Sequence, residues 1–255
     1  MRALITGGSS GIGLAFAKNL AEHGASLILV ALDDEKLTAA AEQLATGYGV
    51  DVEVMPINLA DPVDVARVAD RLRSDEDPVD FLINDAGIGL HDPLTNDVID
   101  RQLLAMDIMV IAVLKLSSAA AAAMVRRGQG RILNIASASS WIYTGNYSAI
   151  KRWVLSYTQA LALELEGTGV SATAVCPGWV KTGFHETSGI ARPNVPGFFW
   201  VGADTVAREG LAAAMTGRAV CIPSLKWRVA IWLAQHGPQS LVKAVSRALT
   251  KSRRH

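Results

Sequence analysis

Residues 6–13 read Thr6-Gly7-Gly8-Ser9-Ser10-Gly11-Ile12-Gly13, between an aliphatic run at 2–6 and a segment of helical period from residue 11. Glycines in a turn that leaves a strand and opens a helix let the backbone approach a pyrophosphate, which then lies at the positive end of the helix dipole. No Lys-Ser/Thr pair follows the glycines, which disfavours a nucleoside triphosphatase loop. The turn therefore predicts a dinucleotide site, with a purely structural turn as the alternative.

The rest of the chain continues the alternation of short aliphatic runs and longer helical segments. Runs typical of strands lie at 2–6, 26–31, 51–57, 79–84, 130–136, 170–176 and 219–222, and segments of helical period lie at 11–22, 34–46, 62–74, 98–127, 146–166 and 204–215. This order is typical of β-α-β units. It predicts an α/β fold, a single-domain Rossmann-type doubly wound parallel sheet of about seven strands with helices on both faces.

Composition sets further limits. The 255 residues (27.0 kDa) are 50% hydrophobic and 19% charged, and Lys plus Arg equals Asp plus Glu at 24 each. A balanced charge gives no bulk attraction to nucleic acid, so we expect no nucleic-acid partner. The two cysteines, Cys176 and Cys221, have no metal-ligand spacing and suit a reducing compartment, and no metal site is predicted. We also expect no run long enough to span a bilayer and no signal peptide, and so a cytoplasmic protein.

Tyr147 and Lys151 lie four residues apart on a predicted helix and therefore share one face. A neighbouring ammonium lowers the pKa of a phenol, which lets a tyrosine exchange protons near neutral pH. Ser137, at the end of the fifth predicted strand, offers a hydroxyl that could hold a carbonyl oxygen. A surface tyrosine beside a solvated lysine is the alternative for the Tyr-x-x-x-Lys string alone.

Five motifs in order resemble the short-chain dehydrogenase/reductase family. They are Thr-Gly-x-x-x-Gly-Ile-Gly at 6–13, an Asn-Ala-Gly-type element at 84–87, Asn-Ile-Ala-Ser ending at residue 137, Tyr-x-x-x-Lys at 147–151 and Pro-Gly-Trp-Val-Lys-Thr at 177–182. The resemblance covers residues 2 to 222 and implies an NAD(P)-dependent oxidoreductase that interconverts an alcohol and a ketone. It implies that Tyr147 is the acid/base, that Lys151 binds the nicotinamide ribose and tunes Tyr147, and that Ser137 orients the carbonyl.

The resemblance, together with the glycine turn and the end of the second predicted strand, also implies a set of cofactor contacts. The expected cofactor-binding residues are Gly7, Ser9, Ser10, Gly11, Ile12, Gly13, Leu32, Asp33, Asn58, Leu59, Asn84, Ala86, Gly87, Tyr147, Lys151, Pro177, Gly178, Val180 and Thr182. Within this set, Val180 and Thr182 are expected at the nicotinamide carboxamide.

Three residues depart from the family's usual pattern. Asp85 replaces the second Asn of Asn-Asn-Ala-Gly, and we expect its carboxylate near the adenosine half of the cofactor, where it would weaken binding. Asp107 stands where a fourth catalytic residue, an Asn in the long middle helix, is expected; it either keeps the helix geometry and a water relay or adds a disturbing charge. Asn58 replaces an Asp and keeps an acceptor for the adenine amine. The loop between Ser137 and Tyr147 is shorter than is common.

The second predicted strand ends in Val30-Ala31-Leu32-Asp33-Asp34-Glu35. An acid at this position accepts hydrogen bonds from the ribose hydroxyls of NAD, whereas an Arg would pair with the extra phosphate of NADP. The acids therefore favour NAD over NADP. Asp33 is also a good N-cap for the next helix, and this structural interpretation stays open.

Residues 177–203 contain eight glycines and prolines and predict a long irregular substrate loop. Ten of the 15 aromatic residues fall between positions 141 and 200, and the candidate substrate contacts are Trp141, Tyr143, Trp179 and Phe184. Such residues suit an apolar pocket for a lipophilic ketone or alcohol. They could equally pack the loop onto the sheet or meet a second subunit.

The chain divides into a cofactor-binding and catalytic unit at 1–222 and a basic C-terminal extension at 223–255. From residue 210 to the end there are eight basic residues and no acidic ones. An amphipathic basic helix there indicates either peripheral contact with an anionic membrane or a core-packed helix with a solvated face.

These patterns predict an enzyme that oxidises or reduces a small lipophilic alcohol or ketone with NAD or NADP. The alternative, suggested by Asp85 and Asp107, is a nicotinamide-dinucleotide-binding sensor or scaffold without turnover. The family resemblance also implies a homo-oligomer.

Overall fold

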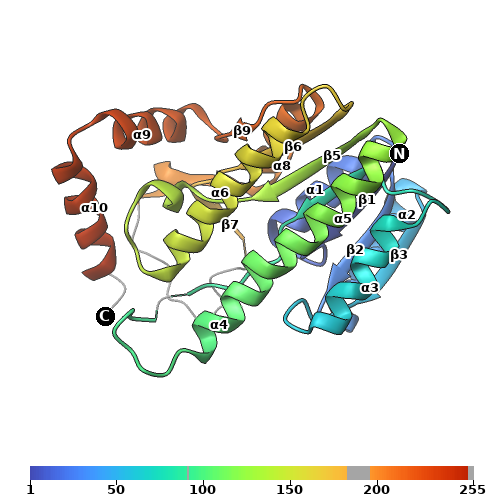
Figure 1. The fold of residues 1–255 in the computed structure, drawn as a ribbon, viewed down its shortest axis with the longest axis horizontal. Helices are drawn as coiled ribbons and strands as arrows, with labels where there is room; N and C mark the ends of the chain where they lie inside the picture. The colour runs from blue at the N-terminus through green and yellow to red at the C-terminus, as the bar shows by residue number, and fades with distance from the viewer. Residues whose placement is uncertain (91, 183–195, 252–255) are drawn as a thin grey trace.

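The computed structural model describes residues 1–90, 92–182 and 196–251. Its centre is a parallel sheet in the order β3-β2-β1-β4-β5-β6-β9, covered by helices on both faces (Figure 1). The strands are β1 (Arg2–Thr6), β2 (Ser26–Ala31), β3 (Val52–Pro56), β4 (Phe81–Asn84), β5 (Gly130–Ile135), β6 (Val170–Val175) and β9 (Val220–Cys221). The predicted seven-stranded doubly wound fold is confirmed. Strand order reverses between β1 and β4, and ligands of such sheets bind at this point.

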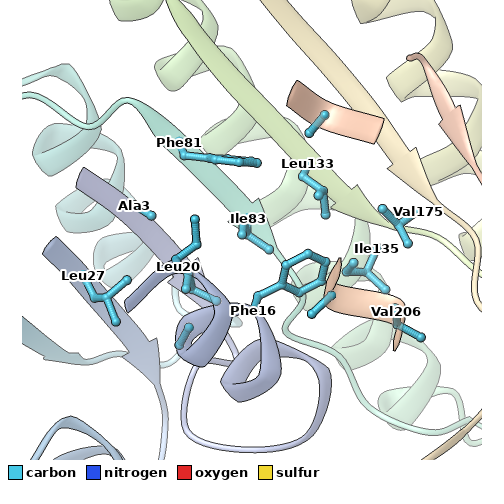
Figure 2. Packing of buried hydrophobic residues seen from close by; sticks show 14 of the residues in the cluster. Ala3, Phe16, Leu20, Leu27, Phe81, Ile83, Leu133, Ile135, Val175 and Val206 are labelled. Carbon is cyan, nitrogen blue, oxygen red and sulfur yellow. The ribbon is translucent and has the colours of Figure 1, made fainter. Parts of the chain in front are cut away.

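The described helices are α1 (Gly11–Glu22), α2 (Asp34–Tyr48), α3 (Pro62–Arg73), α4 (Asp100–Met106), α5 (Ala112–Arg127), α6 (Asn146–Glu164), α8 (Ala203–Met215), α9 (Leu225–His236) and α10 (Gln239–Lys251). Two apolar layers separate them from the sheet. Phe16 of α1 packs in one layer against residues of β4, β5 and α8, as Figure 2 shows for Ile83, Ile135 and Val206. The other layer joins the sheet to α3 and α5. Strands buried on both faces explain the continuous aliphatic runs of the sequence.

The long middle helix differs from the prediction in its centre. Residues Asp107–Ile111 form a π-helical turn between α4 and α5, so that the helix from Asp100 to Arg127 is continuous but locally widened. This helix is long and apolar enough to cross a membrane, and our expectation of no such run was wrong. Half of its most apolar window is buried inside the fold, where α5 packs against α3 and β5, as expected for a core helix.

The predicted irregular loop at 177–203 contains regular structure in its described parts. Strand β7 (Trp179–Lys181) pairs in parallel with β8 (Trp200–Gly202), and a short 3₁₀ turn at Gly197–Phe199 precedes β8. The aromatic and β-branched residues at 179–180 and 200–201 suit such strands.

Helices α9 and α10 follow the last strand and lie at one end of the molecule (left in Figure 1). Trp227 of α9 is buried, its ring is tilted against that of Trp179 at a centroid distance of 5.3 Å, and its Nε1 donates to the Phe199 carbonyl oxygen at 3.0 Å. Helix α10 is linked to the body through Ser246, whose Oγ accepts from the Tyr143 backbone N–H at 3.0 Å. Residues 223–251 therefore pack on the rest of the fold.

Candidate active site

The glycine turn leaves its backbone open to the close approach of a ligand. Gly7 has a φ of +72°, and a Cβ at Gly13 would lie 2.3 Å from the Gly7 carbonyl oxygen. No side chain fits at either position without moving the backbone. Thr6 Oγ1 accepts from the backbone N–H groups of Asp85 and Ala86 at 3.1 and 3.2 Å, and this ties the turn to the end of β4. The first turn of α1 is thus open for an anion.

A cavity of about 720 Å³ extends from this turn across the carboxyl ends of the strands. It brings together most of the expected cofactor contacts, namely Gly7, Ser10, Gly11, Ile12, Ala86, Gly87, Tyr147, Lys151, Pro177, Gly178, Val180 and Thr182. A backbone cradle without side chains at the N-terminus of α1, followed by a broad cavity, fits a dinucleotide.

Tyr147, Lys151 and Ser137 all line this cavity. Lys151 Nζ lies 5.8 Å from the centroid of the Tyr147 ring and donates a 2.8 Å hydrogen bond to the Ile135 carbonyl oxygen. Ser137 Oγ accepts from the Ser139 backbone N–H at 3.1 Å, which leaves its own proton to donate. The phenol, the ammonium and the hydroxyl thus line one cavity, with the ammonium close to the phenol ring.

Asp85 places a second ionisable group beside Lys151. Burial raises the pKa of Asp85 to about 7, against the attraction of Lys151 and a hydrogen bond from the Gly13 backbone N–H. Burial lowers the pKa of Lys151 to about 8, and the Asp85 charge opposes this fall. At neutral pH Lys151 therefore keeps its proton for the most part.

The structure places the Asp85 carboxyl between the glycine turn and Lys151. A Cβ on Gly13 would lie 2.9 Å from Asp85 Oδ2, so the carboxyl packs directly on α1. Sequence reasoning expected this carboxylate near the adenosine half of the cofactor; the structure brings it against Gly13 of the glycine turn and within electrostatic reach of Lys151.

Several expected contacts do not line the cavity. Asn84 is buried, and its amide donates to Ser117 Oγ and Asn134 Oδ1. Ser9 and Gly13 shape the turn from outside the lining. Leu59 packs in the core with α3, and Asn58 Oδ1 accepts from the Ala60 backbone N–H at 3.1 Å.

Leu32 and Asp33 also lie outside the lining, at the end of β2. Asp33 accepts from the Lys36 backbone N–H at 3.1 Å and forms an ion pair with Lys36 Nζ at 2.7 Å. These bonds lower the pKa of Asp33. The capping role that the sequence left open is confirmed, and Leu32 is exposed by 72%.

Asp107 begins the π-helical turn, and its side chain is exposed and outside the cavity lining. The backbone carbonyl of Asp107 accepts from the Ala112 N–H. The side chain that sequence reasoning nominated as a fourth catalytic group is therefore not brought to Tyr147, because the cavity side of this helix carries Met109.

Among the candidate substrate contacts, Trp141 and Trp179 line the cavity. Tyr143 is half exposed and does not line the cavity, and Phe184 lies outside the described residues.

Sequence reasoning missed that the C-terminal helices line the same cavity. The lining includes Trp227, Ala230, Ile231, Leu233 and Ala234 of α9, and Leu241, Val242, Val245 and Leu249 of α10. The helical spacing of 227, 230, 231 and 234 could have revealed an inward apolar face, but not what it faces.

A family model described as short chain dehydrogenase matches residues 1–192. The 3-oxoacyl-[acyl-carrier-protein] reductase FabG of Escherichia coli is 32% identical over 191 residues, covering 71% of this chain and 73% of that protein. A short-chain dehydrogenase from Sphingobium yanoikuyae, solved in complex with NADPH, superposes with a TM-score of 0.82 at 32% identity, covering 92% and 93% of the two chains.

The bulky-bulky ketone specific alcohol dehydrogenase of Comamonas testosteroni superposes with a TM-score of 0.78 at 28% identity, covering 94% of this chain and 93% of that one. With the glycine turn, Tyr147 and Lys151 meeting at the strand-order reversal, these matches establish that the chain belongs to the short-chain dehydrogenase/reductase family of NAD(P)-dependent oxidoreductases.

Proposed function

We propose that the protein interconverts a secondary alcohol and a ketone that carries a large apolar group. The observation that carries this proposal is the lining of the cavity. Asp85 and Lys151 are the charged side chains among its described lining residues, and Tyr147 and Ser137 line the same cavity. The described lining also contains Ser10, Ser139 and Thr182, but most of its other side chains are aliphatic or aromatic, which favours an uncharged substrate body.

In this proposal Tyr147 transfers the proton to or from the substrate oxygen. The Lys151 ammonium, held by the Ile135 carbonyl, favours the ionised form of the phenol. Ser137 donates its remaining proton to the substrate oxygen and fixes it near Tyr147. The bound nicotinamide supplies the hydride acceptor or donor.

For the cofactor we propose a preference for NAD over NADP. The Asp33 carboxylate at the end of β2 would repel a 2′-phosphate, although its pairing with Lys36 weakens that repulsion. The Sphingobium relative was solved in complex with NADPH, so NADPH is the competing cofactor in this test. Comparison of kcat/KM for NADH and NADPH tests this preference. In Asp33→Ser we expect the ratio of kcat/KM with NADH to kcat/KM with NADPH to fall.

Turnover is tested by following nicotinamide absorbance with a panel of apolar ketones and alcohols. We expect activity that rises with the apolar size of the substrate, and Tyr147→Phe is expected to abolish turnover while leaving dinucleotide binding intact. Cofactor binding without turnover on any panel member, in wild type and variant alike, would instead support a sensor or scaffold. The names of two relatives, the ketone-specific alcohol dehydrogenase of Comamonas testosteroni and the 3-oxoacyl-[acyl-carrier-protein] reductase of Escherichia coli, support the enzymatic proposal.

We further propose a homo-oligomer that pairs through α4 and α5. Their outer face exposes Leu103, Leu104, Met106, Ile111 and Leu114, each by 40% or more. Exposed apolar side chains in a continuous stripe mark an association surface. Light scattering of wild type and Leu104→Glu would reveal the oligomer and its loss.

A cytoplasmic location is proposed from the two thiols. Cys176 and Cys221 are both free and buried, which suits a reducing compartment. Fractionation of cells expressing the tagged protein tests this assignment.

A further inference from the structure

Helix α9 has two apolar faces. Trp227 and Ile231 are buried beside the cavity, and Ala230 and Ala234 continue this inner face. On the opposite side an outer apolar stripe consists of Leu225, Val229, Trp232 and Leu233, exposed by 71, 52, 57 and 46%. Helical spacing places each set on one side of the helix. Within the described residues the outer stripe stays exposed apart from the Trp232 ring, which stacks on His236 of the same helix at a centroid distance of 4.9 Å, whereas the inner face packs on the body of the fold.

The cavity reaches the surface at this stripe. Leu233, Leu241 and Val245 line the cavity and are also exposed by 46, 49 and 43%, whereas Val242 of the same lining is buried. The three exposed residues therefore form the rim between α9 and α10. Since Leu233 belongs to both sets, the outer apolar stripe is continuous with the mouth of the cavity.

Positive charge accompanies this apolar surface. Residues 210–255 carry eight basic side chains and no acidic one. Two of the basic groups are used internally: Lys226 Nζ donates to the Phe198 and Trp200 carbonyl oxygens, and Arg228 pairs with Glu209 at 2.6 Å. On α10, Lys243 and Arg247 are exposed and have no ion-pair partner within the described part of the chain.

Lys243 and Arg247 lie on the side of α10 away from the cavity. They are therefore free to attract an external anionic surface.

We propose that the outer faces of α9 and α10, residues 225–251, bind an anionic membrane surface. The exposed Val, Leu and Trp side chains of α9 and the exposed cations of the next helix, α10, together have the composition of an interfacial segment. A second copy of the same face is disfavoured, because an isologous contact would bring the two sets of cations together. The stripe is aliphatic and aromatic, which suits acyl chains better than the polar surface of an acidic protein.

This surface would also explain the position of the cavity mouth. An apolar substrate dissolved in the bilayer could pass the rim at Leu233, Leu241 and Val245 without crossing water. This delivery role depends on the proposed function, whereas membrane binding itself does not.

The experiment is vesicle co-sedimentation of the full-length protein. Vesicles of phosphatidylcholine alone are compared with vesicles containing about one third phosphatidylglycerol, which supplies the negative surface. The test variants are Lys243→Gln/Arg247→Gln, which removes two cations, and Val229→Ser/Trp232→Ser, which removes apolar contacts. The matched control is Arg126→Gln/Arg208→Gln, two basic residues exposed by 55 and 67% on α5 and α8.

We expect wild type and control to bind the anionic vesicles and to bind neutral vesicles weakly. Each basic residue near an anionic surface contributes about fivefold to the partition coefficient, so the first variant should lose about thirtyfold. The second variant should also lose binding, and salt should weaken the wild type. Equal sedimentation of wild type and both test variants overturns the proposal.

Two further outcomes also overturn it. Binding that requires no anionic lipid would contradict the role of the cations, and light scattering in which Val229→Ser/Trp232→Ser lowers the mass of the oligomer would assign the face to assembly. Turnover of a small water-soluble ketone should be the same in all variants. If the wild type shows no turnover of that ketone, the result counts against the proposed enzyme function. Vesicle binding is measured independently of turnover and still tests the membrane proposal.

Discussion

Asp85→Asn offers the sharpest test of the electrostatics at the site. Burial raises the pKa of Asp85 from 3.8 to about 7, so between these two values the folded protein holds a proton that the unfolded chain has lost. The contribution of Asp85 to the stability of the wild type therefore falls as pH rises through this window. Asn keeps an oxygen that can accept from the Gly13 N–H and carries no charge.

The pKa difference corresponds to on the order of 4 kcal/mol at pH values above both pKa values, with the attraction of Lys151 already included. Asp85 lines the cavity and keeps some contact with water there, which reduces the penalty, so we expect about half of it, roughly 2 kcal/mol. Asp85→Asn should thus be more stable than wild type at about pH 8, and the difference should shrink toward about pH 5.

Urea unfolding at several pH values measures this difference, and Asp51→Asn at an exposed position serves as the control. A loss of stability in Asp85→Asn at about pH 8, or a difference that does not change with pH, would refute the reasoning. The first result would mean that the carboxylate is held as a net stabilising partner of Lys151, and the second that folding does not shift the pKa of Asp85.

Three other outcomes are expected. In Gly178→Ala the new Cβ would lie 1.8 Å from the Trp227 ring, so the free energy of unfolding should fall by about 1–3 kcal/mol and the KM for apolar ketones should change. Gly47→Ala, which has open space around the new Cβ, is the control and should be neutral or slightly stabilising in thermal denaturation. In Thr158→Val the buried Asn134 amide loses its 3.0 Å acceptor, and chemical denaturation should show a loss of about 1–3 kcal/mol; an unchanged midpoint would contradict this. Ketone reduction should decline above about pH 8, where Lys151 loses its proton, and a kcat/KM that stays flat through higher pH would remove Lys151 from the proton chemistry.

The elements of the fold could be predicted because each has a local cause. Aliphatic runs buried on both faces define the strands, and Asp33 and Asp61 accept from backbone N–H groups at the starts of α2 and α3. The interruption of the middle helix at 107–111 could not be predicted, since a π-helical turn has no propensity signature and depends on what the helix packs against.

The candidate site was predictable to the extent that it follows from short-range spacing. Tyr147 and Lys151 share a helix face, and the glycine turn joins β1 to α1 within a few residues. Asn84 shows the limit: its motif suggested the cofactor, but its side chain turns inward to Asn134 on the neighbouring strand. Which side of a strand faces a cavity depends on the sheet register and not on the motif.

The amino-acid order alone was sufficient for the strands and helices of the α/β pattern, the dinucleotide turn and the Tyr-Lys pair, because each arises within one helix, one strand or one turn. Three-dimensional packing alone placed Asp85 beside Lys151 and brought Trp227 and α10 over the cavity. These groups are separated by tens of residues along the chain, and the crossovers of the sheet bring them together.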